Sequence, residues 1–322
     1  MPQSIIENDY FEFIAVADGV YAAIVIEGSG AIGNAGIVDL GTKALVFDTS
    51  ESPSSAAFLR EAVIQLTGRQ PSFVVNSHAH YDHWLGNQVF KDAVIITAFD
   101  TWRQMQAFAE DMREDLQHPE AFQNDLKELE QRLRSVDDPQ VQEAIRYSMR
   151  RMQQTIQDLP VLELTLPDLV FGGHIQISGS QRNVQLSAAG AGHTDSDVIL
   201  QLPGEGIAFI GDLGFFNRQP FLADCHPAVW MSLIEELLDW DVQTIIPGHG
   251  PVGTKKDLEL ELQYLVMIQE LVQNALQADI PLETILQQRL PAPFDSWSAD
   301  GLPKEGNLRF LYPFLARGNQ SG

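Results

Sequence analysis

The chain of 322 residues contains one cysteine, Cys225, so it has no intrachain disulfide. A disulfide framework of the kind that stabilises small secreted domains is excluded, and a reducing compartment fits this composition. The N-terminal sequence lacks a basic segment followed by an apolar one and predicts no secretory signal. No apolar run approaches the roughly 20 residues of a membrane span. We therefore expect a cytoplasmic protein with no membrane partner.

Basic residues are scarce, since 20 Lys and Arg stand against 44 Asp and Glu, for a formal net charge of −24. Such an excess of acidic groups keeps a protein soluble and repels polyanions. Because nucleic-acid binding needs a basic face, we expect no nucleic-acid partner and predict a small-molecule substrate. With 44% hydrophobic and 20% charged residues, the composition is that of a globular chain. Nothing in the sequence specifies an oligomeric state.

The order of strand and helix patterns predicts two groups of strands, each followed by helix. Residues 10–50 contain short apolar or alternating runs broken by Gly, Asp and Asn, which is typical of β-strands. A helix at about Pro53–Leu66 and strands at 73–76 and 93–97 are expected next. Later elements are the strands DLVFGG, HIQIS, VQLSAAG, DVILQLP and GIAFIGD, a helix at about Ala228–Trp240 and the strand TIIPG. This order indicates two packed sheets with helices outside.

A polar segment from about Phe99 to Leu159 carries helical rather than strand periodicity. Apolar residues recur there at three- and four-residue steps on both sides of a turn at 135–140. We predict a helical hairpin, with room for one earlier helix before it. The simpler interpretation is an ornament that packs its apolar stripe on the main body, and the functional one is a lid or a wall of a substrate pocket.

The C-terminal part is predicted to be mostly helical, in 255–277 and 281–288, because apolar residues recur there at helical spacing. The tail from Pro291 shows no such spacing and is expected to be a loop. The chain contains no internal repeat and no low-complexity linker.

The stretch NSHAHYDHWLGN, residues 76–87, places four candidate metal ligands within six positions, in a chain with eight histidines. His78 and His80 are two apart, so in an extended backbone both imidazoles point to one side and can reach one ion. Asp82 and His83 follow at the expected start of a short helix, where the dipole favours a carboxylate. One zinc ion needs three or four ligands, so these four residues cannot fill two sites alone.

Three later segments repeat one pattern, in which an apolar strand and a glycine come before a candidate ligand. AAGAGHTDSD contains His193, FIGDLGFF contains Asp212, and TIIPGHGPVG contains His249. Glycine lets the backbone turn sharply and approach an ion closely. Ligands on loops held by rigid strands suit a preorganised site, so the sequence predicts a metal site built from four segments.

HAHYDH, followed in order by GHT, GD and PGHG, resembles the metallo-β-lactamase-fold hydrolase superfamily over roughly residues 18–255. Asp48 in LVFDT also matches the acidic residue that precedes the first histidine motif of that family. The resemblance implies an α/β fold, a four-layer αββα sandwich with the metal site along one edge of its two sheets. We therefore expect a domain at 1–255 with a helical insertion at about 99–160, and a helical C-terminal extension at 256–322.

Carried over position by position, the resemblance also implies two metal sites. The first metal would be held by His78, His80 and His193, the second by Asp82, His83 and His249, with Asp212 bridging the two and Asp48 supporting the ligands. Two zinc ions per chain are expected, and iron or manganese would suit the same ligands. Family members with a cysteine ligand carry it where this chain has Asp212. The chain is therefore more similar to the thioesterases, lactonases and phosphodiesterases, with a glyoxalase-II-like metal site.

The predicted activity is hydrolysis of a small ester, thioester, lactone or related bond by a metal-bridging hydroxide. Asp82 or Asp212 is the candidate acceptor for the proton of the bridging water. The motif G-x-S-x-G is absent, so a serine hydrolase is not a rival. An iron enzyme of oxygen or redox chemistry and a non-catalytic metal-dependent sensor are the alternatives. The remaining histidines are expected at the surface or in packing: His118, His174 and His226.

Overall fold

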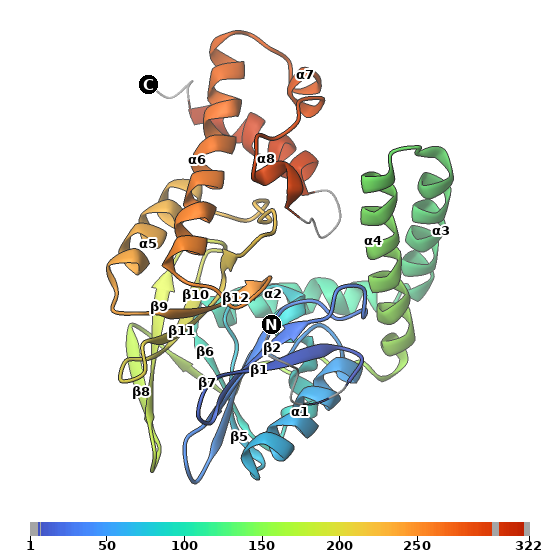
Figure 1. The fold of residues 1–322 in the computed structure, drawn as a ribbon. Coiled ribbons are helices and arrows are strands. Elements are labelled where there is room, and N and C mark those ends of the chain that lie inside the picture. The colour runs from blue at the N-terminus through green and yellow to red at the C-terminus, as the bar shows by residue number, and fades with distance from the viewer. Residues whose placement is uncertain (1–5, 7, 298–302, 319–322) are drawn as a thin grey trace.

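The computed structural model describes residues 6, 8–297 and 303–318 (Figure 1). One group of strands is β1 (Phe11–Ala17), β2 (Val20–Val25), β3 (Ala35–Asp39), β4 (Ala44–Phe47), β5 (Pro71–Val75), β6 (Val94–Ala98) and β7 (Leu169–Phe171). The other is β8 (His174–Ser178), β9 (Asn183–Gly190), β10 (Asp197–Leu202), β11 (Ile207–Phe215) and β12 (Thr244–His249). The α-helices are α1 (Pro53–Thr67), α2 (Phe99–Asp115), α3 (Pro119–Ser135), α4 (Pro139–Asp158), α5 (Pro227–Asp239), α6 (Lys255–Gln277), α7 (Leu282–Leu286) and α8 (Pro303–Gly318).

The two groups of strands form two sheets. The seven-stranded sheet has the order β1-β2-β3-β4-β5-β6-β7, antiparallel up to β4 and parallel from β4 to β7. The five-stranded sheet has the order β12-β11-β10-β9-β8, and only β11 and β12 are parallel. Phe47 pairs with Val75 at the ends of β4 and β5, and Phe215 pairs with His249 at the ends of β11 and β12. Parallel strands end at one edge, so the segments that carry the predicted ligands leave each sheet together.

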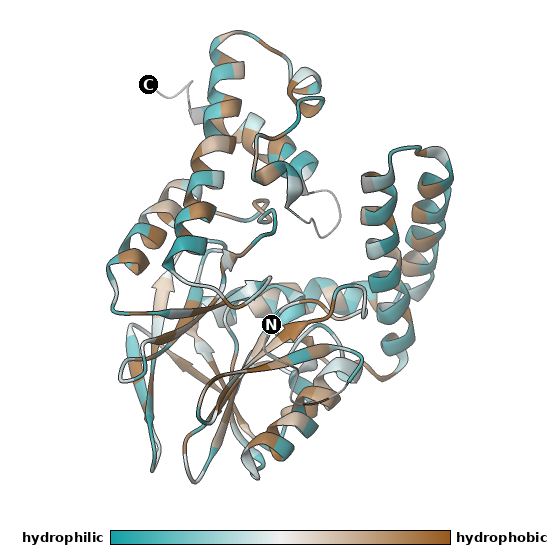
Figure 2. Cartoon of the chain, viewed as in Figure 1, coloured by the Kyte–Doolittle hydropathy of each residue, from teal (hydrophilic) through white to brown (hydrophobic). Residues whose placement is uncertain are grey.

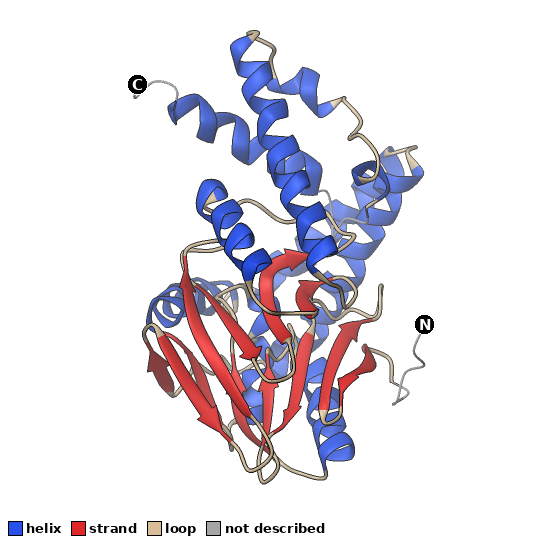
Figure 3. Cartoon of the chain, turned by 60° about the vertical axis from the view of Figure 1, so that its left-hand side comes forward, coloured by secondary structure: helices blue, strands red, loops and turns tan. Residues whose placement is uncertain are grey.

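The sheets pack face to face and helices cover both outer faces (Figure 3). Phe47 of one sheet and Phe209 of the other lie between them, with ring centroids 5.8 Å apart. Leu59 and Val63 of α1 are buried against the seven-stranded sheet, and Trp230 of α5 is buried against the other, together with α6. The four-layer αββα sandwich predicted from the sequence is confirmed.

The bounds of helix α1 are determined by capping residues that can be recognised in the sequence. The Ser52 hydroxyl accepts a hydrogen bond from the Ser55 amide, and Pro53 occupies the first turn, where its missing N–H costs nothing. Gly68 ends the helix in the left-handed conformation, with its N–H donating to the Ile64 carbonyl. Residues at the two ends of the helix therefore determine where it begins and where it ends.

The segment from Phe99 to Asp158 forms α2 and then the helical pair α3 and α4, as predicted. Figure 1 shows α3 and α4 side by side, projecting from the sandwich as an arm. Hydrophilic residues predominate along this α3–α4 arm, with hydrophobic residues between them (Figure 2). Arg151 of α4 pairs with Glu51, at 2.7 Å between Nη2 and Oε1, and Ser54 donates to Asp158 at 2.6 Å. The base of the arm is therefore fixed to the β4–α1 connection and to the first turn of α1.

The prediction of a loop from Pro291 onward is wrong for the described part of the tail. Phe294–Ser296 is a short 3-10 helix and α8 runs over Pro303–Gly318; residues 298–302 lie outside the described part. Leu308 and Leu311 of α8 are fully buried in the cluster that includes α6. Pro and Gly make this segment a poor isolated helix, so packing on α6 decides its structure.

Two expectations concern the termini and membranes. The expectation of no secretory signal rests partly on residues 1–5 and 7, which the structure does not describe. Within the described residues, no helix combines the length and the apolar character that crossing a membrane requires.

Candidate metal centre

The turn after β5 carries four of the predicted ligands. A short 3-10 helix, Tyr81–His83, follows at the predicted place, and it directs Asp82 and His83 inward, where both are buried. The turn is fastened to both sheets, because the Val198 amide of β10 donates to the Ser77 carbonyl at 2.7 Å, and the Asn76 amide donates to the Ile96 carbonyl. The ligand turn thus lies at the joint between the two sheets.

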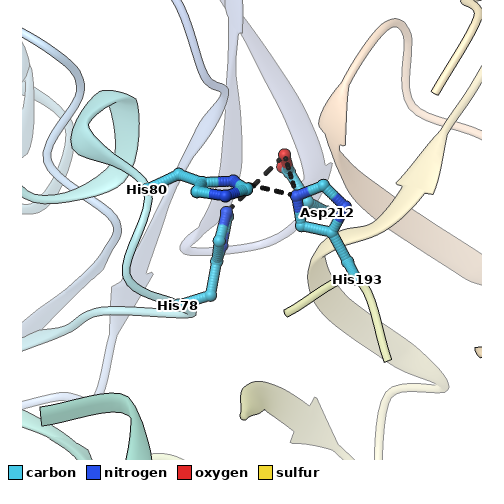
Figure 4. Close-up of side chains that lie close together, drawn as sticks. All are labelled: His78, His80, His193 and Asp212. Atoms are coloured by element: carbon cyan, nitrogen blue, oxygen red, sulfur yellow. Dashed lines mark hydrogen bonds and ion pairs between the residues drawn. The ribbon is translucent and has the colours of Figure 1, made fainter. Parts of the chain in front are cut away.

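Four predicted ligands from three segments converge on one point: His78, His80, His193 and Asp212. One ligand atom from each lies within 4.8 Å of the others, and Figure 4 shows the side chains pointing toward one another. Asp212 Oδ2 is 3.3 Å from His193 Nε2 and 3.7 Å from His78 Nε2. His80 Nδ1 is 3.0 Å from His193 Nε2. We call these residues the first ligand group.

A second group consists of Asp82, His83 and His249, whose ligand atoms also lie within 4.8 Å of one another. Asp82 Oδ2 is 3.3 Å from both His83 Nε2 and His249 Nε2. Asp212 also faces this group, with Oδ1 3.1 Å from His83 Nε2 and Oδ2 3.2 Å from His249 Nε2. Asp212 therefore lies between the two groups, the position expected for a bridging ligand.

The donor atoms fit metal ions. His78 Nε2, His83 Nε2 and Asp212 Oδ1 are buried, and none makes a hydrogen bond of good geometry, although the last two lie 3.1 Å apart. Buried polar atoms are almost always partnered, so three orphaned atoms facing one another indicate a ligand that completes them. All seven residues offer imidazole nitrogen or carboxylate oxygen, which suits zinc and equally iron or manganese.

Burial keeps two imidazoles of the first group neutral. It lowers the pKa of His193 to about 3, and it lowers the pKa of His78 well below the ordinary value, helped by the neighbouring His83. A neutral imidazole keeps the nitrogen lone pair that metal binding requires. At neutral pH both rings are therefore ready to bind a cation.

The carboxylates of the centre are ionised and create a strongly negative potential. Burial by itself would raise the pKa of Asp82 and Asp212, but the facing imidazoles hold both pKa values well below the ordinary range. His83 responds in the opposite sense: burial disfavours its charge, yet Asp212, Asp82 and Asp48 raise its pKa well above the ordinary value. Carboxylates that hold a proton on a buried imidazole also attract a metal cation.

Asp48 supports the centre from the end of β4. Its carboxylate accepts hydrogen bonds from the Ser77 amide and hydroxyl, both at 2.7 Å, and lies 2.9 Å from His83 Nδ1. This contact leaves His83 Nε2 for the ligand group. The Asp48 backbone has φ of 60°, a left-handed conformation that costs energy outside glycine and is common at functional sites.

Glycine permits the close approach that the sequence pattern predicted. A Cβ on Gly248 would collide with the Asp212 carboxylate, and one on Gly33 would lie 2.5 Å from the Asp82 carbonyl oxygen. Gly211 adopts φ of 53°, and its Cβ would lie 2.7 Å from the Ser77 Cβ. Side chains at these positions would push the ligand segments apart.

Three supporting contacts were missed from the sequence. Glu51, which lies beside Asp82, forms an ion pair with Arg151 of the arm. Asp224 Oδ2 lies 3.0 Å from His80 Nε2. Glu261 of α6 is fully buried and accepts a hydrogen bond from the Phe215 amide, and the Phe215 ring stacks on His249. The hydrogen bonds and ion pairs of Glu51, Asp224 and Glu261 join residues at least 46 positions apart and belong to no local motif, so no sequence signal indicated them.

Residues expected to lie outside the centre do so. His118, His174 and His226 are exposed and contact Glu120, Ser187 and Asp195, respectively. Cys225 is buried, and burial raises the pKa of its thiol to about 12, which makes it a poor nucleophile at neutral pH.

Two adjoining cavities lead away from the centre. A cavity of about 260 Å³ reaches His249 and is also lined by Ile32, Phe216 and Arg218. A larger one, of about 670 Å³, lies between α4 and the C-terminal segment, with Leu286 and Trp297 in its wall. The two cavities share Glu27 and Tyr147 as lining residues. The centre is therefore accessible from a space between the arm and the C-terminal helices.

Comparisons with known proteins agree with this architecture. The family model described as the metallo-beta-lactamase superfamily matches residues 28–249. A metallo-beta-lactamase from Pontibacter korlensis is 17% identical, with a TM-score of 0.55, over 79% of this chain and 98% of that chain. The DIM-1 metallo-beta-lactamase is 15% identical, with a TM-score of 0.57, over 80% and 98%. No curated protein matches this chain.

At these identities the two solved structures show a shared fold and nothing about a shared substrate. The family model reaches further, because the residues that it matches include every predicted ligand from His78 to His249. It also spans well over half of the chain, including the ligand segments of both sheets. The chain therefore belongs to the metallo-β-lactamase superfamily.

Proposed function

We propose that the protein is a hydrolase with two metal ions, most simply zinc, that cleaves a small ester, thioester, lactone or related bond. The observation that carries this proposal is the position of Asp212, whose carboxylate faces the imidazoles of both ligand groups. His78, His80 and His193 would hold the first metal, Asp82, His83 and His249 the second, and Asp212 both. When bound, such ions supply Lewis acidity and a hydroxide nucleophile at neutral pH.

The residues of the chain would serve this chemistry in distinct ways. Asp82 and Asp212 lie among the ligand atoms, so by position each is a candidate acceptor for the proton that the nucleophile loses. Asp48 would fix the ring of His83 through its Nδ1. The burial of His78, His83 and His193 keeps bulk water away from the ligand atoms.

The cavities give the substrate a place. Its scissile bond would lie beside His249, and the rest would extend past Glu27 and Tyr147 into the larger cavity. Its volume is within the range of about 300–1,000 Å³ that small-molecule sites occupy. In this arrangement α4 is a wall of the substrate pocket, so the insertion has a functional role beyond packing. We also propose that residues 1–255, with the insertion at 99–160, form the hydrolase domain and that 256–322 form its extension.

A hydrolysis panel tests the proposal. Initial rates would be measured for the zinc-loaded protein against a thioester, a lactone, a phosphodiester and a β-lactam, each repeated after chelation. The β-lactam belongs in the panel because both solved neighbours are described as metallo-β-lactamases. With aspartate rather than cysteine at position 212, we expect it to be a poorer substrate than the thioester or the lactone. Turnover should disappear with chelation and return with zinc.

The alternatives predict other outcomes. An iron enzyme would show its activity with iron and oxygen and none with zinc. A sensor would bind metal tightly and turn over no compound in the panel. Metal analysis of the protein as purified, followed by the same panel with iron and manganese, separates these cases, and absence of turnover with every metal would refute the hydrolase.

A further inference from the structure

His80 differs from the other histidines of the first ligand group, because its outer edge reaches solvent. Its side chain is 14% exposed, whereas those of His78 and His193 are fully buried. Its Nδ1 faces His193 Nε2 at 3.0 Å, and its Nε2 lies 3.0 Å from Asp224 Oδ2. An ionised carboxylate only accepts hydrogen bonds, so the proton of a neutral His80 ring is on Nε2. The Nδ1 lone pair therefore points into the ligand group.

Two aromatic rings enclose the same imidazole. Phe108 of α2 lies nearly parallel to it, with centroids 6.2 Å apart and an interplanar angle of 6°. Phe221 meets it edge-on at 5.8 Å and 76°. Neither ring fixes rotation of the imidazole within its own plane or selects its tautomer. The hydrogen bond to Asp224 does both.

Asp224 belongs to a connection that the C-terminal helix holds in place. Asn307 of α8 is buried; its Oδ1 accepts from the Leu222 amide at 3.0 Å, and its Nδ2 donates to the Pro220 carbonyl at 2.7 Å. At the other end of the connection, the His226 amide donates to the Gly192 carbonyl, directly before His193. The segment from Pro220 to His226 is thus fastened on both sides of Asp224.

We propose that Asp224 is a positioning residue for the first metal, which orients His80 and sets its tautomer, and that Asn307 anchors the connection that carries Asp224. The inference rests on the metal-binding part of the proposed function. The C-terminal extension then has a specific role, because Asn307 of α8 supports the metal site. Partners of the outer nitrogen of metal-bound histidines typically change metal affinity by about 10- to 100-fold.

The test measures metal binding without turnover. The metal-free full chain would be titrated with zinc in competition with a chromophoric chelator, and separately with cobalt(II), whose absorption reports ligand geometry. In Asp224→Leu we expect one of the two sites to lose about 10- to 100-fold in affinity and its cobalt spectrum to change, while the other site is unaffected. Asp224→Asn should recover part of the loss, because an amide oxygen still accepts the His80 N–H.

Glu120→Leu is the matched control. Glu120 lies 3.3 Å from His118 and both side chains are well exposed, so this variant removes a histidine–carboxylate pair that belongs to neither ligand group and lies outside the Pro220–His226 connection. Both metal affinities should remain as in the wild type. If Asp224→Leu binds zinc at both sites within twofold of the wild type with an unchanged cobalt spectrum, the proposal is overturned.

Asn307→Ala tests the anchoring step. It should weaken the same site, and combining it with Asp224→Leu should cost little more than Asp224→Leu alone, because both act through His80. Fully additive losses would overturn the anchoring role. These titrations remain interpretable if the hydrolysis panel fails, since a protein that binds metal without turnover still shows whether Asp224 positions a ligand.

Discussion

At the scale of single residues, the carboxyl groups in and beside the centre have pKa values shifted in opposite directions. Asp82 and Asp212 face imidazoles and remain ionised, whereas burial raises the pKa of Asp197 to about 7. Asp197 accepts hydrogen bonds from the Thr194 amide and hydroxyl, so it fixes the turn directly after His193. The same type of residue thus provides charge in one place and turn structure in another.

Asp197 gives a pH prediction. Its native pKa of about 7 exceeds the unfolded value of about 3.9, so between these values the native state binds more protons than the unfolded state. Stability therefore falls as pH rises through this window. Asp197→Asn removes this pH dependence, because an amide does not titrate. Its oxygen still accepts the hydrogen bond from the Thr194 amide N–H, so the turn is kept. Between pH 5 and pH 8 we expect the free energy of unfolding of the variant, relative to that of the wild type, to increase by about 2–3 kcal/mol.

Urea denaturation of both metal-free proteins at several pH values measures this difference. Both proteins contain the same histidines, so the contribution of histidine titration to the pH dependence cancels when the two are compared. Parallel pH profiles would show that the Asp197 carboxyl titrates at its ordinary pKa.

The sequence indicated the candidate ligands and the supporting Asp48, but not Asp224, for a physical reason. His78, His80 and His83 are close in sequence because one turn presents them, and His193 follows a strand and a glycine, so each leaves a local pattern. Asp224 approaches His80 from 144 residues away. Its contact depends on how α8 and the sheets pack, and no spacing in the sequence encodes that.

At the scale of elements, the α3–α4 arm is held at its base by one partly buried ion pair. Glu51 has a side-chain exposure of 10%, against 45% for Arg151. Arg151→Ala leaves the Glu51 carboxylate without its cation, which we expect to lower the free energy of unfolding by about 1–3 kcal/mol. Adding Glu51→Gln to Arg151→Ala should recover part of that loss, because burying an unpaired neutral amide costs less free energy than burying an unpaired carboxylate.

A double-mutant cycle by chemical denaturation measures this coupling. Arg132→Ala is the control, because Arg132 of α3 is 3.9 Å from Glu305 and both side chains are well exposed. Removing such a pair should change stability by less than about 0.5 kcal/mol. Equal effects of Arg151→Ala and Arg132→Ala would mean that the Glu51 pair does not hold the arm.

Elements with local signals were predicted well and elements without them were not. The capping Ser52, Pro53 and Gly68 of α1 bracket a helix whose predicted and observed bounds differ by one residue. Helix α8 contains Gly306 and Pro313, which oppose helix formation, and it exists because Leu308 and Leu311 are buried with α6. Tertiary packing overrode propensity there, and only the assembled structure reveals it.

At the scale of the whole molecule, the predicted ligands come from both sheets. His78, His80, Asp82 and His83 follow the seven-stranded sheet, while His193, Asp212 and His249 belong to the five-stranded one. A metal that binds only the native arrangement stabilises it by mass action, by about 4 kcal/mol when free metal is 1,000 times its dissociation constant. Removing the metals should therefore lower the melting temperature of the entire molecule in one transition.

Calorimetry with and without a chelator, followed by zinc addition, measures this shift. Glu120→Leu, which leaves the candidate ligands intact, should show the same shift on chelation as the wild type. A melting temperature that does not respond to chelation would mean that no metal links the sheets.

The chain leaves the seven-stranded sheet at the end of β6 and returns at β7, its parallel neighbour, after completing α2, α3 and α4. The inserted segment of α2, α3 and α4 therefore begins and ends at adjacent strands, and no predicted ligand lies within it. With α4 as a wall of the substrate pocket, as proposed, chemistry and recognition would be encoded in separable stretches of one gene. Natural variation in residues 116–158 would then alter what is recognised while the reacting centre is inherited unchanged.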